Sequence, residues 1–253
     1  VVWQCIDSKE FQRLRRIRQL GGDFQVYPTA EHSRFSHSLG VYEIVRRMVT
    51  EIKSLSNELS EYDKVSVMLA GLLHDVGHGP FSHAFEHVTN HSHEDYTVKI
   101  ILGDTELNSV LSKVSKNLPH DIVAIIQHTH KNDILNQIVS GQLDADRMDY
   151  LLRDSYFTAT SYGQFDLERI LRTMRVRKID DDKKQLVVKY TGIHSVEDYI
   201  MARYQMYWQV YYHPVARSYE TVFIQLFKRL NDIFKVNKDY FSDIKVLVPF
   251  LEK

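Results

Sequence analysis

The sequence predicts a mainly α-helical fold that carries one small β-hairpin. Apolar residues recur at helical spacing along most of the 253-residue chain, and one region, residues 176–190, alternates as two paired strands would. No internal repeat and no linker rich in Gly, Ser or Pro divides the sequence. We therefore predict a single domain over residues 1–253. Because the chain begins at Val1 without a methionine and ends inside the apolar segment VLVPFLEK, we expect a fragment of a longer protein.

The composition is that of an ordinary globular protein. Apolar residues make up 43% of the chain, which is enough to fill a sizeable core. The formal charge of -1 gives no overall signal for nucleic acid or for a membrane surface. The one cysteine, Cys5, excludes an intrachain disulfide framework. With no secretory leader and no long apolar run, we expect a cytoplasmic protein without a membrane partner.

The N-terminal segment predicts a helix with a basic face. Asp7 to Glu10 has the pattern of a capping box, and Gly21 and Gly22 end the helix. An apolar stripe lies between them, formed by Phe11, Leu14, Ile17 and Leu20. The other faces carry four arginines: Arg13, Arg15, Arg16 and Arg18. This basic face is either a solvated surface, which the sequence slightly favours, or a phosphate-binding surface.

Several helices are predicted in the next part of the chain. The first runs from residue 36 to about residue 59, with His37 in its first turn, and the second runs over residues 61–74. Two shorter helices are predicted over residues 107–118 and 121–128, and Pro119 starts the second of these.

The chain is organised around residues 65–83. This apolar run ends in the adjacent pair His74 and Asp75 and is then broken by Gly77, Gly79 and Pro80. Burying a neighbouring imidazole and carboxylate is costly unless something pairs them, and a divalent cation would satisfy both. The alternative is a core pair that is only hydrogen-bonded.

Histidines are concentrated in the same region. Six of the thirteen lie between residues 74 and 93: His74, His78, His83, His87, His91 and His93. Surface loops rarely need this many imidazoles, and the segment has little helical periodicity. We therefore expect some of these side chains to titrate or to bind a metal.

The predicted helix over residues 143–156 has a polar stripe. Its members recur every four residues: Asp146, Tyr150 and Asp154. A purely structural explanation would pair the two acids with Arg147 and Arg153, but neither arginine lies on that face. We therefore interpret the stripe as facing a ligand.

The C-terminal part adds the hairpin and two helices. Residues 176–179 and 186–190 flank a polar turn, and residues 195–198 are a capping box for a helix rich in aromatic residues. One face of that helix carries Arg203, Tyr207 and Tyr211. Aromatic residues at this spacing are more often core than ligand site, so the arginine is the unusual member. A last amphipathic helix is predicted from residue 219 to residue 234.

In chain order, His37, then His74 with Asp75, then Asp146 form the pattern H, HD, D, and the sequence resembles the HD-domain phosphohydrolase superfamily. Four longer segments look like the deoxynucleoside triphosphate triphosphohydrolases, the branch with the SAM-and-HD-domain enzyme and its bacterial relatives. They are QLGG at 19–22, HSRFSHSLG at 32–40, HDVGHGPFSH at 74–83 and DADRMDY at 144–150. The resemblance covers most of residues 1 to about 219 and implies an HD-domain helical fold.

The resemblance implies a metal site and a catalytic group. The implied metal ligands are His37, His74, Asp75 and Asp146. Mixed nitrogen and oxygen donors suit Mn²⁺, Mg²⁺, Fe, Ni²⁺ or Zn²⁺, so the metal is not decided. The implied catalytic histidine is His83, which would protonate the leaving 5′-oxygen or assist attack. Glu86 and His93 would orient it, with His78 close by.

The resemblance also implies how a deoxynucleoside triphosphate (dNTP) would be held. Three arginines would neutralise the triphosphate: Arg34, Arg147 and Arg203. Gln19 and Asp154 would hydrogen-bond the sugar 3′-hydroxyl. Leu20 and Tyr150 would cover the face of the ribose where a 2′-hydroxyl would clash, and Tyr211 would lie near the sugar and base.

Regulation is implied as well. Asp7, Gln12 and Arg15 match positions that recognise a guanine nucleotide effector, GTP or dGTP, between subunits of a tetramer. A missing C-terminal part would complete regulation or oligomerisation.

The expected activity is metal-dependent hydrolysis of dNTPs to deoxynucleoside and inorganic triphosphate. The alternatives are a generic HD phosphatase or phosphodiesterase on nucleotide monophosphates or cyclic nucleotides, and a silent nucleotide sensor. Binding of single-stranded nucleic acid is left open.

Overall fold

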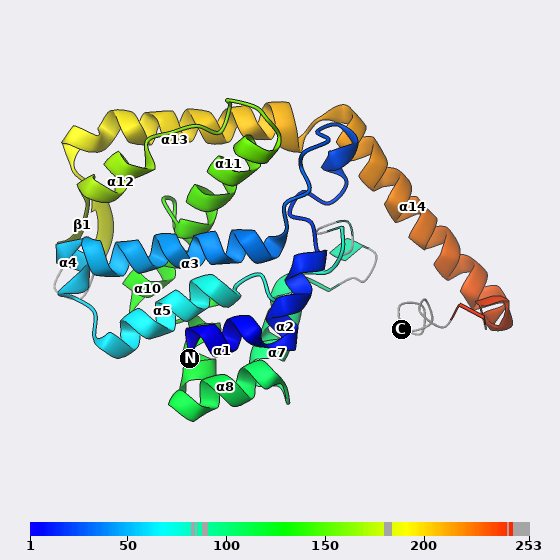
Figure 1. Ribbon diagram of the computed structural model, residues 1–253, viewed down its shortest axis with the longest axis horizontal. Helices are drawn as coiled ribbons and strands as arrows, with labels where there is room; N and C mark the ends of the chain where they lie inside the picture. Colours follow the sequence, from blue (N-terminus) through cyan, green and yellow to red (C-terminus); the bar gives the residue numbers. More distant parts are fainter. Residues whose placement is uncertain (82–83, 85, 88–90, 180–183, 242, 245–253) are drawn as a thin grey trace.

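The computed structural model describes residues 1–81, 84, 86–87, 91–179, 184–241 and 243–244. In this part of the chain the protein consists of helices and one two-stranded antiparallel sheet. Figure 1 shows the helices side by side across the body of the molecule, with the last long helix extending away from it. The mainly α-helical fold with a small hairpin is therefore confirmed.

The first half of the chain contains eight described α-helices and two 3-10 turns. The helices are α1 (Val2–Asp7), α2 (Lys9–Gln12), α3 (Arg34–Glu51), α4 (Lys53–Ser56), α5 (Glu61–Leu73), α7 (His93–Leu102), α8 (Glu106–Val114) and α9 (Leu118–Ile126). The 3-10 turns are η1 (Arg13–Arg16) and η2 (Asp23–Gln25).

The second half contains the hairpin and the longest helix. Its elements are α10 (Asp133–Ser140), α11 (Ala145–Phe157), α12 (Leu167–Thr173), β1 (Met174–Lys178), β2 (Lys184–Val188), η3 (Tyr190–Gly192), α13 (Ile193–Met206), the π-helical turn η4 (Tyr207–Tyr211), α14 (Pro214–Val236) and η5 (Lys238–Phe241). The strands pair from Met174 with Val188 to Lys178 with Lys184.

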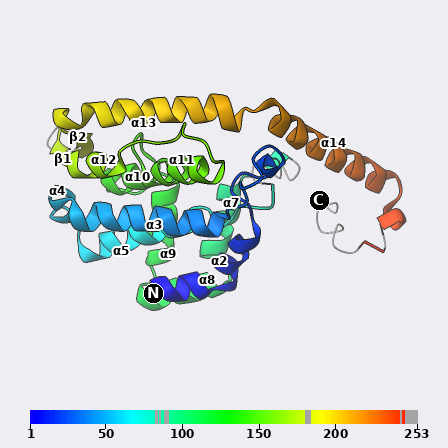
Figure 2. The same ribbon diagram turned by 45° about the horizontal axis from the view of Figure 1, so that its top comes forward.

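Helix α3 is the centre of the fold. It packs against both α5 and α11, and Figures 1 and 2 show the three helices running through the middle of the molecule. Their shared core includes Val41, Val45, Met48, Leu69, Leu72, Met148 and Leu151, all with no exposed surface. Burying one side chain of this size stabilises the fold by about 1.5–3 kcal/mol. This packing brings the start of α3, the end of α5 and the start of α11 together.

The N-terminal segment differs from the single helix that the sequence predicts. Helix α1 ends at Asp7, and the side chain of Ser8 caps α2 by accepting a hydrogen bond from the amide of Phe11. The helical path ends at Arg16 because the next residues pair with the chain before α3. There Gln19 N donates to His32 O at 2.9 Å, and an isolated bridge joins Arg18 to Ser33.

Other boundaries also differ from the sequence prediction. Helix α3 ends at Glu51 instead of reaching residue 59, and α13 begins after Gly192, so Ser195 is not its cap. Helix α14 begins at Pro214, five residues before the predicted start, since proline is well suited to the first turn of a helix. Three helices that the sequence did not indicate are α7, α10 and α12.

The start of α14 is held against the segment between η1 and α3. Tyr219 packs so closely over Gly22 that a Cβ atom on this glycine would overlap the tyrosine ring. The ring also meets Phe24 edge-on, with 6.4 Å between ring centroids. As a result, the first turns of α14 lie beside η2.

Among the described residues, no helix has both the length and the apolar character required to cross a bilayer.

We expect Gly40→Ala to destabilise the protein, because a Cβ on Gly40 would overlap Asp149 Oδ1 and Arg153 Nη2 where α3 meets α11. The expected loss is about 1–3 kcal/mol in the free energy of unfolding, measured by urea denaturation. Thr50→Ala, at an exposed position of the same helix, is the control. Equal stability of the two variants would contradict the close approach of α3 and α11.

Candidate metal centre and ligand cavity

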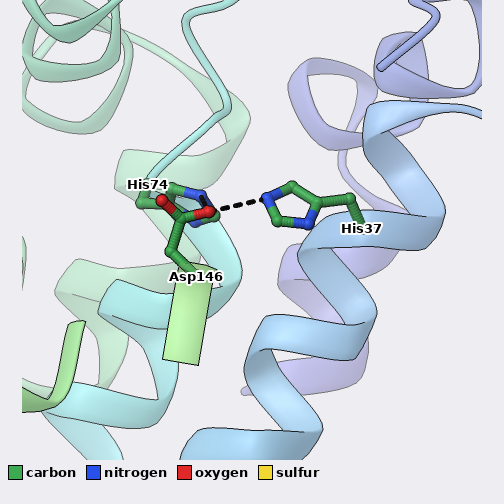
Figure 3. A group of neighbouring side chains, drawn as sticks. All are labelled: His37, His74 and Asp146. Carbon is green, nitrogen blue, oxygen red and sulfur yellow. Dashed lines mark ion pairs between the residues drawn. The ribbon is translucent and has the colours of Figure 1, made fainter. Parts of the chain in front are cut away.

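Three helices each contribute one metal-binding type of side chain to a common point. His37 comes from the first turn of α3, His74 follows the last residue of α5, and Asp146 lies in the first turn of α11. Figure 3 shows the two imidazoles directed at the carboxylate of Asp146. His37 Nε2 lies 3.0 Å and His74 Nε2 lies 3.5 Å from Asp146 Oδ1. The three ligand atoms lie within 4.8 Å of one another.

The hydrogen bonds of His37 and His74 use Nδ1 of each ring, which leaves Nε2 to bind a metal. His37 Nδ1 donates to Asp149 Oδ2 at 2.8 Å, and His74 Nδ1 donates to the carbonyl oxygen of Gly71 at 2.9 Å. Both Nε2 atoms are buried and have no hydrogen-bond partner among the described residues. A metal-ligating histidine normally donates its other ring N–H in this way. The group therefore fits a divalent metal ion, and its nitrogen and oxygen donors leave the ion's identity undetermined.

Asp75, the fourth predicted ligand, lies next to this group but has a different partner. Its carboxylate is 3.3 Å from His74 Nε2 and 3.7 Å from His37 Nε2. Its Oδ2 atom accepts a hydrogen bond from Arg34 Nη1. Asp75 also forms a second possible metal-binding group with His78 and His93. Three of the four predicted ligands thus share one point, and the assignment of Asp75 stays a prediction.

Buried charges govern the protonation of these groups. Burial lowers the pKa of His37, but its close contacts with the carboxylates of Asp146 and Asp149 raise that pKa more strongly, to about 10. Burial raises the pKa of Asp75, yet the charges of Arg34 and His74 hold it well below its usual range. The carboxylates of the site are therefore ionised, as metal ligation requires.

The predicted catalytic group is only partly described. His83 lies outside the described residues. His78 Nε2 is 3.4 Å from Asp75 Oδ1, and its ring stacks on His93 with 3.8 Å between centroids. His93 Nδ1 in turn donates to Glu86 Oε1 at 2.5 Å. The structure thus brings His78, Glu86 and His93 into one chain of contacts that ends at Asp75.

A cavity of about 510 Å³ is lined by Arg34 and by most of the predicted substrate contacts. Six of the eight predicted residues line it: Gln19, Leu20, Arg34, Tyr150, Asp154 and Tyr211. Its size is typical of small-molecule sites. Because Arg34 lines the cavity and also binds Asp75, the cavity reaches the edge of the metal group.

Two residues predicted to contact phosphate, Arg147 and Arg203, are not among the described residues that line this cavity. Arg147 donates to Gly141 O at 2.6 Å and pairs with the buried Asp144, which caps α11. The guanidinium of Arg203 lies over the ring of Tyr207, 5.8 Å from its centroid. The sequence could not indicate these partners because they depend on how α11 and α13 pack.

Asp154, the last member of the predicted stripe, is fixed by two hydrogen bonds. His32 Nε2 donates to its Oδ1 at 2.6 Å, and Tyr211 Oη donates to its Oδ2 at 2.9 Å. The His32 ring also stacks on Phe157, with 4.6 Å between centroids. Burial and the negative charge of Asp154 raise the pKa of Tyr211, so its hydroxyl stays a donor.

The predicted effector residues lie in the N-terminal segment. Arg15 Nε donates to Gln12 Oε1 at 2.7 Å, and Gln12 Nε2 donates to Ile6 O at 2.7 Å. The guanidinium of Arg15 also lies 3.7 Å from the centroid of the Phe35 ring. Gln12 and Arg15 are thus adjacent, while Asp7 is the exposed last residue of α1. Their role as an effector site stays a prediction.

Sequence reasoning missed two supporting residues, Asp149 and His32. Asp149 lies one helical turn after Asp146, which could have indicated a second carboxylate directed at α3. Its Oδ1 and Oδ2 atoms accept from Arg153 Nη2 at 2.8 Å and Nε at 2.7 Å. His32 had no comparable signal, because its contact with Asp154 joins residues far apart in the chain.

Comparison with known families agrees with this architecture. The family described as HD domain matches residues 34–154, which include His37, His74, Asp75 and Asp146, and the family described as HD associated region matches residues 165–244. The chain belongs to the HD-domain family. The resemblance predicted from the sequence is confirmed.

Individual relatives extend the comparison. The uncharacterized protein YwfO of Bacillus subtilis (strain 168) is 54% identical over 233 residues, which cover 92% of this chain and 53% of YwfO. The deoxynucleoside triphosphate triphosphohydrolase SAMHD1 homolog of Dictyostelium discoideum is 33% identical over 98% of this chain and 49% of that protein. A phosphohydrolase crystal structure from Bacteroides thetaiotaomicron has a TM-score of 0.81 at 34% identity, over 92% of this chain and 55% of that one. The chain spans about half the length of the curated relatives it matches.

Asp149→Asn should weaken metal binding about 10- to 100-fold, because it removes the charge that orients His37 and makes its ring more basic. Asp104→Asn, in an exposed loop, is the matched control. The measurement is metal content after dialysis against graded Mn²⁺, with the melting temperature as a check on folding. Equal metal content in the two variants would show that Asp149 does not support the site.

Asp23, which lines the cavity, gives a prediction about pH. Burial, and then the charges of Glu220 and Asp154, raise its pKa from 3.8 to about 7, while Arg217 lowers it and Tyr27 also faces it. The folded state therefore binds more protons than the unfolded state between about pH 4 and pH 7, so this group's contribution to stability falls as pH rises.

Asp23→Asn removes that contribution. The difference in free energy of unfolding, variant minus wild type, should increase from pH 5 to pH 8 by on the order of 2 kcal/mol. Urea unfolding of both proteins at the two pH values measures it, and other titrating groups cancel in the difference. A difference that does not change with pH would disprove the raised pKa.

Proposed function

We propose that this protein hydrolyses deoxynucleoside triphosphates to deoxynucleoside and inorganic triphosphate with a divalent metal ion. One observation carries the proposal. The cavity lined by the predicted sugar contacts is also lined by Arg34, which is hydrogen-bonded to Asp75 beside the group of His37, His74 and Asp146. A nucleotide in the cavity would therefore have its sugar near Asp154 and its phosphates near the metal group.

The charges of the described residues support a phosphate at that end. Arg34 is 6% exposed, donates to Asp75 and lines the cavity. An arginine fork matches the geometry of phosphate oxygens. When bound, a divalent cation supplies Lewis-acid polarisation of a phosphoryl oxygen. We infer that Arg34 would shift from Asp75 toward the α-phosphate as the carboxylate becomes a ligand.

The other end of the substrate would be selected by packing and hydrogen bonding. In this proposal Asp154, held by His32 and Tyr211, accepts from the 3′-hydroxyl, and Gln19 is its second partner. The rings of Tyr150 and Tyr211 lie 6.0 Å apart between centroids. In this proposal Tyr150 would close the space where a 2′-hydroxyl projects. A stranded hydroxyl there would cost about 1–3 kcal/mol, which favours deoxyribose.

Proton transfer would fall to the histidine group. We propose that His83 protonates the leaving 5′-oxygen and that His93, fixed by Glu86, orients it. Burial and the charge of Arg34 lower the pKa of His78 well below its usual range, so His78 is a neutral neighbour in this scheme.

Activation by a guanine nucleotide in a homotetramer is the regulatory part of the proposal. Its support is the proximity of the N-terminal segment to the metal group. Arg13 Nη2 donates to the carbonyl oxygen of Val76 at 2.5 Å, one residue after Asp75. Arg15 lies on Phe35, which adjoins Arg34. An effector that repositions these arginines would act on both flanks of Asp75.

The activity test uses the full natural chain with Mn²⁺ or Mg²⁺, each of the four dNTPs, and GTP or dGTP. We expect chromatography to detect deoxynucleoside and triphosphate, chelation to abolish turnover, and added metal to restore it. Asp146→Ala should lose bound metal and activity together, whereas His83→Ala should keep the metal and lose at least about 100-fold in kcat.

Other products would lead to other conclusions. Phosphate or pyrophosphate released from a dNTP would indicate a generic HD phosphatase or phosphodiesterase. Tight nucleotide binding without release of any product under all these conditions would indicate a nucleotide sensor.

A further inference from the structure

The cavity has lining residues that the proposed chemistry does not use. They are Asp23 from η2, and Arg217 and Glu220 from the first turns of α14. Contact of Tyr219 with Gly22 and Phe24 fixes α14 at this position. The predicted phosphate and sugar contacts include none of these three residues. These three residues therefore form a further part of the cavity wall, which two segments distant in sequence supply.

Asp23 is the unusual member of this wall. It is 6% exposed, yet its carboxylate has no hydrogen bond or ion pair with any of the described residues. Its backbone is fully used, since Asp23 N donates to Leu20 O and Asp23 O accepts from Tyr27 N. Buried carboxylates are normally hydrogen-bonded, because an unsatisfied one costs free energy. A side chain of this kind that borders a cavity indicates a ligand with hydrogen-bond donors.

Arg217, the cationic residue of this group, already has partners. Arg217 Nη1 donates to Glu220 Oε2 at 2.6 Å, and its guanidinium lies 5.2 Å from the ring centroid of Tyr212. This pairing neutralises Glu220 but leaves its second oxygen able to accept. This part of the wall therefore offers carboxylate acceptors to a ligand, and the aromatic rings of Tyr207 and Tyr212 line the same cavity.

From this geometry we infer that Asp23 and Glu220 recognise the nucleobase and favour a base with an exocyclic amino group over thymine. The inference rests on the proposed function, because it takes the metal group as the phosphate end. An ionised carboxylate only accepts hydrogen bonds. Adenine, cytosine and guanine each present an amino donor, whereas thymine presents one N–H between two carbonyl oxygens that would repel a carboxylate. The neighbouring tyrosine rings provide faces on which any base can stack.

The experiment compares kcat/KM for dATP, dCTP, dGTP and dTTP at pH 8, using the full natural chain with metal and effector. Wild type should prefer the amino-bearing substrates over dTTP by about tenfold, which is the effect of one hydrogen bond to a charged group. Asp23→Asn should reduce this preference to about twofold, because an amide can also donate to a thymine carbonyl. Glu220→Gln, at a half-buried position of α14, should reduce it in the same direction. Asp232→Asn, exposed on the same helix, should leave the preference unchanged.

The outcomes separate this inference from the proposed function. If wild type releases triphosphate from all four dNTPs at equal rates, or if both variants keep the wild-type preference, the base-recognition role is wrong while the activity stands. If wild type hydrolyses no dNTP, the proposed function fails and the inference fails with it. Melting temperatures within a few degrees of wild type would show that Asp23→Asn and Glu220→Gln are folded.

Discussion

The hydrogen bond from His37 Nδ1 to Asp149 Oδ2 is the interaction on which the site depends. It joins the first turn of α3 to α11 in the interior, and Arg153 holds the same carboxylate through two further hydrogen bonds. Gly40 permits this contact because it has no side chain where α11 comes closest. The bond also fixes the orientation of the His37 ring, so that Nε2 faces Asp146. The hydrogen bond that joins α3 to α11 thus also orients His37 as a possible metal ligand.

The packing of α3 against α11 also determines where the cavity lies. Arg34 lies three residues before His37 on α3 and directs its guanidinium to Asp75, whereas Tyr150 and Asp154 follow Asp146 along α11. The two helices that meet at His37 and Asp149 therefore also supply parts of the cavity wall. Further parts come from η2 and α14, and α14 belongs to the segment matched as HD associated region. The result is a cavity lined by residues of both matched segments and of the segment before α3.

Much of the centre could be predicted because its signals are local. The His74 and Asp75 pair at the end of an apolar helix, and the spacing of Asp146, Tyr150 and Asp154, follow from helical geometry alone. The separate sites of Arg147 and Arg203 could not be predicted, because Asp144 and Tyr207 compete for these guanidinium groups after folding. The broken N-terminal helix was also missed, since residues 17–19 exchange helical hydrogen bonds for pairing with residues 32–34.

By itself, the sequence determined the helical class, the hairpin and the membership of the HD-domain family, because apolar periodicity and short motifs are properties of neighbouring residues. Only the tertiary structure decided that Asp75 pairs with Arg34, that His32 supports Asp154, and that Asp23 borders the cavity without a partner among the described residues. Each of these facts depends on residues brought together from distant parts of the chain. Helix packing determines which side chains become partners when they are far apart in the sequence, and this packing cannot be read from local sequence patterns.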